Sequence, residues 1–523
     1  MADRPNILLV MTDQQRFDTI AALGNQDIYT PNMDRLVRRG LAFTNAYSTC
    51  PVCVAARYTI RTGYQPPTTR IFSNGRSEPA SGQAATLPER CGPYLAETLR
   101  DRGYRTFGIG KFHTQPWDER LGYEVHLHSE ELYGSPDQRR RDAYAHWISA
   151  EHPAFDYIEA LMGERTEMYY MPQVSPMPAE ITVERWAADR AVEQIGAPDD
   201  AAADCRRPYF GFVSFVGPHP PFAPPVPFNR MYDPDRMPNP VRGDPDTDLM
   251  DEQIRWMNYA IFADDISDAR ARSLKARYYG EISYIDDCLG RILGAVEARD
   301  DADNTVICFF ADHGDHLGDH HAWQKESFFE PSCHIPFLVS WPAALPADAR
   351  RDELVCLADL FAIATGASGE VETRDGTDVL GIVSGDVPPR SCLVGMYGEP
   401  RTSLFKIMIR EDNATEGRVW KYVFMANGGY RQLFDLASDP HELHNLVDEC
   451  PGIVRKLHAT AAYVCDVPGA RDALGGGPGG CDLKDFPYTP RPLLRIYQFD
   501  QSRGVTGFPD HPADVLRPRP GLD

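Results

Sequence analysis

Short runs of apolar residues recur along the chain and predict the strands of a buried sheet. Each run is continuous rather than alternating, which is typical of strands covered by helices on both faces. Turn residues bound the runs, and stretches with helical spacing separate them. We therefore predict an α/β fold in which a large mixed, mainly parallel sheet is sandwiched by helices. The predicted strands occupy residues 6–11, 106–110, 209–217, 305–312 and 335–341.

The intervening helices are marked by their ends as well as by their apolar spacing. Pro31 stands near the start of one helical segment, and Gly40 stands where that segment should end. The segment 92–103 has the same arrangement. Residues 274–299 carry apolar side chains at helical spacing and lead directly into the strand at 305–312. This order predicts a helix that packs on the sheet.

The pattern changes after about residue 395, which predicts a second structural unit. Apolar and polar residues then alternate as in a small antiparallel sheet, and a helix is expected near 451–464. Glycine and proline dominate the end of the chain. We predict a catalytic α/β domain over 1–395, a small α+β subdomain over 396–467 and an extended tail over 468–523. The tail keeps aromatic and aliphatic residues, which packing on another subunit or on its own chain would explain. We expect a homo-oligomer with the tail at the subunit interface.

Composition narrows the class of protein. The chain has 523 residues, 42% of them hydrophobic, which indicates a folded protein of enzyme size. Its net charge of −23 argues against nucleic acid or an anionic membrane as a partner, because both require a basic face. No segment approaches a membrane span, and the first apolar run is too short for a secretory signal. Twelve cysteines without paired spacing suit reduced thiols, so we expect a cytoplasmic protein.

Polar side chains follow four of the predicted strands. The carboxyl ends of parallel strands meet at one edge of a sheet, so these side chains are expected to lie together. Two segments rich in proline and charge, 114–180 and 220–260, are predicted to form loops around that edge. The polar residues concerned are Asp13, Gln14, Lys111, His113, His219, Asp312 and His313.

Several of these residues are candidate metal ligands. Asp13, Asp312 and His313 could bind a cation, with the side-chain oxygen of Gln14 as a neutral fourth ligand. Oxygen ligands favour Ca²⁺ or Mg²⁺, and an imidazole moves the preference toward Mn²⁺. The segment "ADHGDHLGDHH" is equally compatible with a solvated loop rich in Asp and His. No regular ligand spacing supports a second metal site among its remaining members, His316, Asp319, His320 and His321.

Four basic residues could form an anion site in this acidic protein. Lys111 and His113 lie in "GKFH" directly after an apolar strand, and His219 follows another strand. Lys325 is the fourth, although a lone lysine is more typical of a surface. Together they would supply the local positive charge that an anionic substrate requires.

The cysteines at 50 and 53 raise three alternatives. A redox pair would need a cofactor or thiol relay, and a structural zinc site would need a second close pair of ligands; the sequence marks neither. The third alternative is that one sulfur is the precursor of a more reactive group. Cys53 opens "CVAAR", which has the form Cys-x-Pro/Ala-x-Arg.

This motif and its surroundings resemble the type I, formylglycine-dependent sulfatases of the alkaline phosphatase superfamily, near the arylsulfatase and phosphonate monoester hydrolase branch. The resemblance implies an alkaline-phosphatase-like fold and hydrolysis of sulfate monoesters. It also implies that a maturase oxidises Cys53 to formylglycine, while Cys50 stays an ordinary thiol. It extends over most of the chain, through "NILLVMTDQQRFD", "TPNMDRLVRRGLAFTNAYSTCPVCVAAR", "GYRTFGIGKFH", "GPHPPF", "ADHGDHLGDH", "WQKESFFE" and "LFDLASDPHELHNL".

The same resemblance implies how the nucleophile works. Hydration of the aldehyde at residue 53 gives a geminal diol, one hydroxyl of which binds the metal and attacks sulfur. Arg57 would hold the diol. His113 would then remove the proton of the second hydroxyl, so that sulfate is expelled and the aldehyde restored. Residue 53 thereby joins Asp13, Gln14, Asp312 and His313 in the implied shell of one Ca²⁺ or Mn²⁺ ion.

The resemblance also implies contacts to a small-molecule sulfate ester. Lys111 would bridge the aldehyde oxygen and the sulfate. His219 and Lys325 would assist the leaving alcohol, and Asn74 would contact the transferred group.

Two positions depart from the usual family pattern. Ala55 replaces the common proline, so conversion of Cys53 requires a maturase that accepts alanine. Gln14 stands where many sulfatases have a second aspartate, a form that also occurs in the phosphonate hydrolase branch. That branch typically has tyrosine and threonine at the positions of Lys111 and His113, so "GKFH" favours sulfate.

Two other functions stay open as alternatives to sulfate ester hydrolysis. A promiscuous phosphonate monoester or phosphodiester hydrolase is the nearest alternative, and a catalytically silent anion-binding homologue is another.

Overall fold

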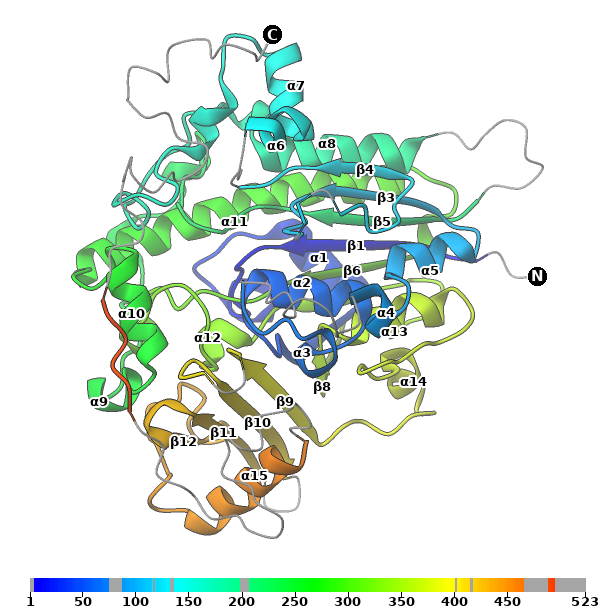
Figure 1. Ribbon diagram of the computed structural model, residues 1–523. Coiled ribbons are helices and arrows are strands. Elements are labelled where there is room, and N and C mark those ends of the chain that lie inside the picture. Colours follow the sequence, from blue (N-terminus) through cyan, green and yellow to red (C-terminus); the bar gives the residue numbers. More distant parts are fainter. Residues whose placement is uncertain are drawn as a thin grey trace.

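The protein consists of a large helix-covered sheet and a small second sheet, as Figure 1 shows. The predicted α/β class is confirmed. The computed structural model describes residues 4–74, 87–114, 116–117, 119–131, 136–197, 207–399, 402–413, 417–464 and 488–493.

The large sheet has eight strands in the order β4-β3-β5-β1-β6-β7-β2-β8. Strand β7 runs antiparallel to both of its neighbours, and every other pair is parallel. The sheet is therefore mixed and mainly parallel, as predicted. Its strands are β1 (Asn6–Thr12), β2 (Leu41–Tyr47), β3 (Arg105–Gly110), β4 (Val125–His128), β5 (Tyr209–Ser214), β6 (Thr305–Ala311), β7 (Phe337–Ser340) and β8 (Ala349–Cys356).

The central strand β1 shows why its apolar run is continuous. Leu8 and Val10 pack in one hydrophobic cluster, whereas Ile7, Leu9 and Met11 pack in another, and all five are fully buried. Burial stabilises each such side chain by about 1.5 to 3 kcal/mol, so both faces contribute. The first cluster includes helices α1 (Pro31–Arg39), α8 (Val183–Gly196) and α11 (Asp268–Glu297); the second includes α2 (Cys53–Thr62), α5 (Leu95–Asp101) and α13 (Asp359–Ala367).

The prediction of loops over 114–180 and 220–260 is wrong in part. Strand β4 lies in the first segment and pairs with β3 at the edge of the sheet, where its four residues are too short to show a pattern. Strand β8 was also missed because it is an edge strand whose first residues are polar and partly exposed. The helices in the two segments are α6 (Pro136–Arg141), α7 (Ala143–Glu151), α9 (Pro245–Asp248) and α10 (Glu252–Ala260).

The small sheet is antiparallel and carries one helix. Its strands β9 (Cys392–Tyr397), β10 (Lys406–Asn413), β11 (Arg418–Met425) and β12 (Tyr430–Asp435) lie in reverse chain order. Helix α15 (Pro451–Val464) packs on this sheet through Val454 and Leu457. The sheet and its helix occupy the lower part of Figure 1.

Most of the tail predicted over 468–523 lies outside the described residues. Its described part, 488–493, contacts α10 of the same chain: the Tyr488 hydroxyl donates to Glu252 Oε2 at 2.6 Å. The remaining short helices are α3 (Pro66–Thr69), α4 (Leu87–Cys91), α12 (Glu330–Cys333) and α14 (Val379–Ser384). Within the described ranges, no helix combines the length and apolar character needed to cross a membrane.

Candidate active site

The polar residues predicted from strand ends meet at the carboxyl edge of the sheet. Strands β3, β5, β1 and β6 are consecutive neighbours, so the residues that follow them converge. Asp13 follows β1, Lys111 follows β3 and Asp312 follows β6, while His219 lies on the loop after β5. All four side chains are buried. The strand order therefore places two acidic and two basic groups at one edge.

Four side chains form a compact cluster of possible metal ligands. One donor atom from each of Asp13, Cys53, Asp312 and His313 lies within 4.8 Å of the others. Cys53 begins α2, and its Sγ lies 3.7 Å from Asp13 Oδ1 and 3.2 Å from His313 Nε2. Two carboxylates and an imidazole around residue 53 form a donor set that fits one divalent cation.

The side chain of Gln14 lies beside this cluster and is held by hydrogen bonds at both ends of its amide. Its backbone lies in the left-handed region at φ 69°, which is uncommon for a residue other than glycine. The amide nitrogen donates to Asp315 Oδ2 at 2.5 Å, and the amide oxygen accepts from Lys325 Nζ at 2.6 Å. The Gln14 oxygen is thus directed toward the basic side of the cluster, where it can act as a neutral ligand.

Arg57 connects the two carboxylates of the cluster. It lies one turn after Cys53 on α2, so both side chains occupy the same face of the helix. Its guanidinium donates to Asp13 Oδ2 at 2.7 Å and to Asp312 Oδ2 at 3.2 Å, and all three side chains are fully buried. Burial and the charge of Asp13 raise the pKa of Asp312 to about 6, although Arg57 opposes this rise. Arg57 therefore both orients and partly neutralises these two carboxylates.

Two lysines place positive charge beside residue 53. Lys325 Nζ lies 3.1 Å from Cys53 Sγ, and Lys111 Nζ lies 2.7 Å from Asp13 Oδ2. Burial and Asp13 alone would raise the pKa of Cys53, but Lys325, Lys111 and His313 outweigh them and hold it well below its usual range. Lys325 is only 5% exposed, so the surface alternative for this lysine is wrong. The site strongly favours negative charge at position 53.

His219 is held in one orientation on the loop after β5. Its Nδ1 lies 2.8 Å from the carbonyl oxygen of Pro220, which fixes Nδ1 as the protonated nitrogen, and 3.6 Å from Glu131 Oε2. Burial lowers the pKa of His219 well below its usual value, and Lys325 and Lys111 add to this effect while Glu131 opposes it. The neutral imidazole therefore presents an unprotonated Nε2 to the site.

His113 and Asn74 have different surroundings. The His113 backbone N–H donates to Glu130, and its buried Nδ1 has no hydrogen-bond partner among the described residues. Asn74 Oδ1 accepts from the backbone N–H of Val54 at 3.1 Å. This bond satisfies an otherwise free donor at the start of α2, where Val52 provides no side-chain cap. Asn74 thus positions the helix that begins at Cys53.

The Asp- and His-rich segment after β6 is not a solvated loop. Residues 311–320 are all buried. His316 hydrogen bonds to Ser327 Oγ at 2.7 Å, and His320 hydrogen bonds to Asp248 Oδ1 at 3.0 Å. None of the four surplus residues of this segment belongs to the metal cluster found among the described residues. They support the loop that carries Asp312 and His313.

Sequence patterns missed Glu131 and Ser214 as members of the site. Glu131 forms an ion pair with Lys111, and Ser214 accepts a hydrogen bond from Arg57 at 2.9 Å. Glu131 lies in the segment predicted to be a loop, and Ser214 ends an otherwise apolar strand. A buried glutamate directly after "VHLHSE" carries no spacing signal, so only the tertiary structure identifies it.

Buried acidic and basic groups that converge at the carboxyl edge of a mainly parallel sheet are the arrangement expected of an enzyme active site. The model of the Sulfatase family matches residues 5–369, so the chain belongs to the sulfatase family of sulfuric ester hydrolases. The chain is 27% identical to an arylsulfatase of Clostridium perfringens over 462 residues, which cover 85% of this chain and 90% of that protein. It is 28% identical to a choline-sulfatase of Rhizobium meliloti over 473 residues, 88% of this chain and 85% of the relative.

The solved structures agree with this fold. The phosphonate monoester hydrolase of Agrobacterium radiobacter aligns with a TM-score of 0.71 and 24% identity, over 87% of this chain and 94% of that one. A 2-O GAG sulfatase, BT1596, aligns with a TM-score of 0.66 and 18% identity, over 93% of this chain and 98% of that one. At these identities the likeness shows the fold alone.

Proposed function

We propose that the protein hydrolyses sulfate monoesters to an alcohol and sulfate, using residue 53 as formylglycine and one divalent cation. The observation that carries this proposal is the position of Cys53. Its Sγ lies within the acidic cluster, 3.7 Å from Asp13, and also 3.1 Å from the ammonium of Lys325. An oxygen nucleophile formed at this position would be adjacent to both the cation ligands and the groups that can bind sulfate.

The residues present fit the two groups that the proposal requires. Asp13, Gln14, Asp312 and His313 would hold Ca²⁺ or Mn²⁺ together with residue 53. When bound, the cation supplies Lewis acidity, and the aldehyde supplies a hydrated oxygen nucleophile that can be regenerated after each turnover.

Lys111 and Lys325 would neutralise the sulfate oxygens. Both ammonium groups are buried and close to residue 53, where the low dielectric strengthens their attraction for charge that develops during transfer. Burial lowers the pKa of Lys325, whereas the charges of Cys53 in its thiol form and of Asp13 raise it overall. As an ammonium, Lys325 would also stabilise the leaving oxygen.

Two histidines would manage the protons of the reaction. His219 must take up a proton at Nε2 before it can protonate the leaving alcohol, because Nδ1 already donates to Pro220. His113 has a buried ring nitrogen without a partner among the described residues, which leaves it able to accept the proton that ends the cycle.

Maturation would depend on an enzyme that accepts Ala55 in the motif. Ala55 is fully buried in the first turn of α2, a position at which proline is also tolerated because no intrahelical bond is lost there. The fold itself thus demands neither residue. The substitution of Ala55 for the common proline would therefore matter for the maturase and not for the fold.

Gln14 favours one alternative function, the hydrolysis of phosphonate monoesters or phosphodiesters. A glutamine where many sulfatases have a second aspartate is the form that the resemblance associates with the phosphonate hydrolase branch, and the esters of that branch carry the same single negative charge as a sulfate monoester. Sulfate, phosphonate and phosphate esters of the same phenol distinguish the two functions. We expect the sulfate ester to have the highest kcat/KM; a higher value for the phosphonate ester would support the alternative.

The test of the main proposal combines one variant with removal of the cation. Cys53→Ala should lose at least about a thousandfold in kcat for para-nitrophenyl sulfate, because no nucleophile remains at that position. EDTA should inactivate the wild type, and Ca²⁺ or Mn²⁺ should restore it. Full activity of Cys53→Ala would overturn the proposal.

A further inference from the structure

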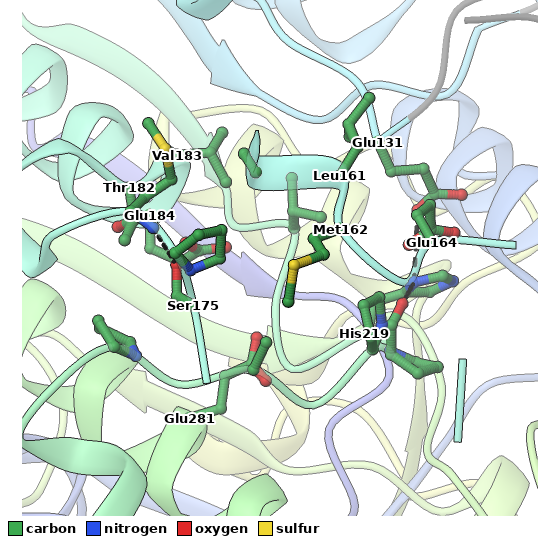
Figure 2. Close-up of a pocket in the computed structure, with 18 of the residues that line it drawn as sticks. Glu131, Leu161, Met162, Glu164, Ser175, Thr182, Val183, Glu184, His219 and Glu281 are labelled. Atoms are coloured by element: carbon green, nitrogen blue, oxygen red, sulfur yellow. Dashed lines mark hydrogen bonds and ion pairs between the residues drawn. The ribbon is translucent and has the colours of Figure 1, made fainter. Parts of the chain in front are cut away.

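An acidic cavity adjoins the site on the side of His219. It has a volume of about 100 Å³ and is shown in Figure 2. His219, Glu131 and Glu164 lie on one side, Glu184 and Glu281 lie on the other, and Met162 lies between them (Figure 2). His219 is the proposed acid for the leaving alcohol, so the alcohol half of a substrate would extend into this space.

The carboxylates near His219 already have cationic partners. Arg165 pairs with Glu131 Oε1 at 2.8 Å and with Glu164 Oε1 at 2.9 Å. Lys111 also pairs with Glu131. The negative charges on this side of the cavity are therefore compensated without a bound ligand.

The carboxylates on the far side lack such partners. No lysine or arginine is among the described residues that line the cavity. Glu281 is 9% exposed, and within the described part of the chain its buried Oε2 has no hydrogen-bond partner. Glu184 Oε1 accepts from the backbone N–H of Gly217 at 3.2 Å, and its other hydrogen bonds, to its own backbone and to Thr182, involve no cation. Figure 2 shows the carboxylate of Glu281 directed toward the part of the cavity where Met162 lies.

These two carboxylates lie close to the reacting centre. Glu184 bonds the backbone of Gly217, and a Cβ atom added to Gly217 would lie 2.7 Å from Glu281 Oε1. Gly217 is two residues before His219, and two residues span at most about 7 Å. A group held between Glu184 and Glu281 would thus be within reach of a small molecule whose oxygen contacts His219.

The remaining walls are apolar and aromatic. Leu161, Met162 and Met177 line the cavity together with the rings of Tyr144 and Tyr284. The hydroxyls of both tyrosines are used elsewhere, at 2.8 Å from Ile181 O and 2.6 Å from Thr182 Oγ1 respectively. Ring faces and thioethers surround an organic cation well, whereas a hydrated metal ion requires more oxygen ligands.

We propose that this cavity binds the alcohol half of a sulfate ester that carries a positively charged nitrogen, with Glu281 and Glu184 facing the cation. The inference rests on the proposed function and names the substrate class of that site. The anionic sulfate would meet Lys111 and Lys325, while the ammonium group would meet the two glutamates. The two ends of the site thus match a dipolar substrate.

The pKa shifts of Glu281 and Glu184 agree with this assignment. Burial raises the pKa of Glu281 well above its usual value, and the charge of Glu184 adds to the rise. Burial also raises the pKa of Glu184. A cation between them would favour the ionised forms and relieve their mutual repulsion.

Two isosteric esters test the inference. Trimethylammonioethyl sulfate is compared with the uncharged ester in which carbon replaces the nitrogen. The wild type should show a kcat/KM at least about tenfold higher for the cationic ester. In Glu281→Gln and in Glu184→Gln the ratio of kcat/KM for the cationic ester to kcat/KM for the uncharged ester should fall toward one. Asp287→Asn removes an exposed carboxylate from the same helix, α11, and should keep the wild-type ratio.

The outcomes separate this inference from the proposed function. If the wild type hydrolyses para-nitrophenyl sulfate but shows no preference between the isosteres, or if Glu281→Gln keeps the preference, the cation site is refuted and sulfatase activity stands. If no sulfate ester is hydrolysed, the proposed function fails. Calorimetric titration with trimethylammonioethanol then decides on the cavity: binding that Glu281→Gln abolishes supports the cation site, and absence of binding overturns it.

Discussion

Replacing Arg57 with methionine should make the stability of the protein depend on the bound cation. Arg57 is the shared partner of Asp13 and Asp312, at 2.7 and 3.2 Å, and all three side chains have no exposed surface. Removing one partner of a buried ion pair costs about 3 to 5 kcal/mol, because the remaining charge is left without compensation. A divalent cation held by the same two carboxylates would offset much of this loss.

The magnitude can be expressed as a melting temperature. An unfolding entropy of about 2 cal/mol/K per residue makes 1 kcal/mol worth roughly 1 °C for a chain of 523 residues. Arg57→Met in EDTA should therefore melt about 3 to 5 °C below the wild type in EDTA. In excess Ca²⁺ or Mn²⁺ the difference should shrink by at least about half.

Differential scanning calorimetry with and without the cation measures both differences. The matched control is Arg16→Met, which removes another buried arginine that pairs with Asp18 at 2.7 Å and Asp319 at 2.8 Å, outside the metal cluster. The decrease in melting temperature that Arg16→Met causes should be the same in EDTA and in Ca²⁺. If Arg57→Met and Arg16→Met respond alike to the cation, the assignment of Asp13 and Asp312 as its ligands is wrong.

Three further predictions concern catalysis, helix packing and pH. Lys325→Ala should lower kcat/KM for para-nitrophenyl sulfate by about 10²- to 10³-fold, and a loss below tenfold would exclude it from stabilising the transferred group. Asp286→Ala should lower the free energy of unfolding by about 1 to 3 kcal/mol in urea titrations, because Asp286 accepts the first N–H groups of α1, whereas Asp286→Asn should lose less. Burial raises the pKa of Glu130, but its hydrogen bond to His128 and the nearby positive charges lower it overall to about 2. This depressed pKa stabilises the protein by about 3 kcal/mol above pH ~4.5, and the stabilisation is lost as the pH falls toward 2. The stability of wild type and Glu130→Gln should thus differ at pH 6 and converge below pH 3; a constant difference would contradict this.

The sequence was sufficient to predict the fold class and the edge of the sheet that carries the site. Continuous apolar runs required strands buried on both faces, and the carboxyl ends of parallel strands brought Asp13, Lys111 and Asp312 together. These predictions succeeded because they depend on local periodicity and on a general property of parallel sheets.

Other features depend on contacts that no local pattern encodes. Glu131 reaches Lys111 from a segment without periodicity, and Asn74 caps α2 from a separate loop. The burial of residues 311–320 also follows from tertiary packing, since their composition alone is typical of a solvated loop. The roles assigned to His113, His219 and Lys325 stay predictions, which the variants above test.

The central claim is tested most directly by counting aldehydes at residue 53. Preparations with different degrees of maturation are treated with a hydroxylamine probe, and the peptide that contains Cys53 is quantified by mass spectrometry as thiol or as oxime. Conversion replaces one sulfur and two hydrogens with one oxygen, so the two forms are distinguishable. The account predicts that kcat for a sulfate ester rises in proportion to the aldehyde fraction and extrapolates to zero without it. Full turnover by protein that carries only the thiol would contradict it.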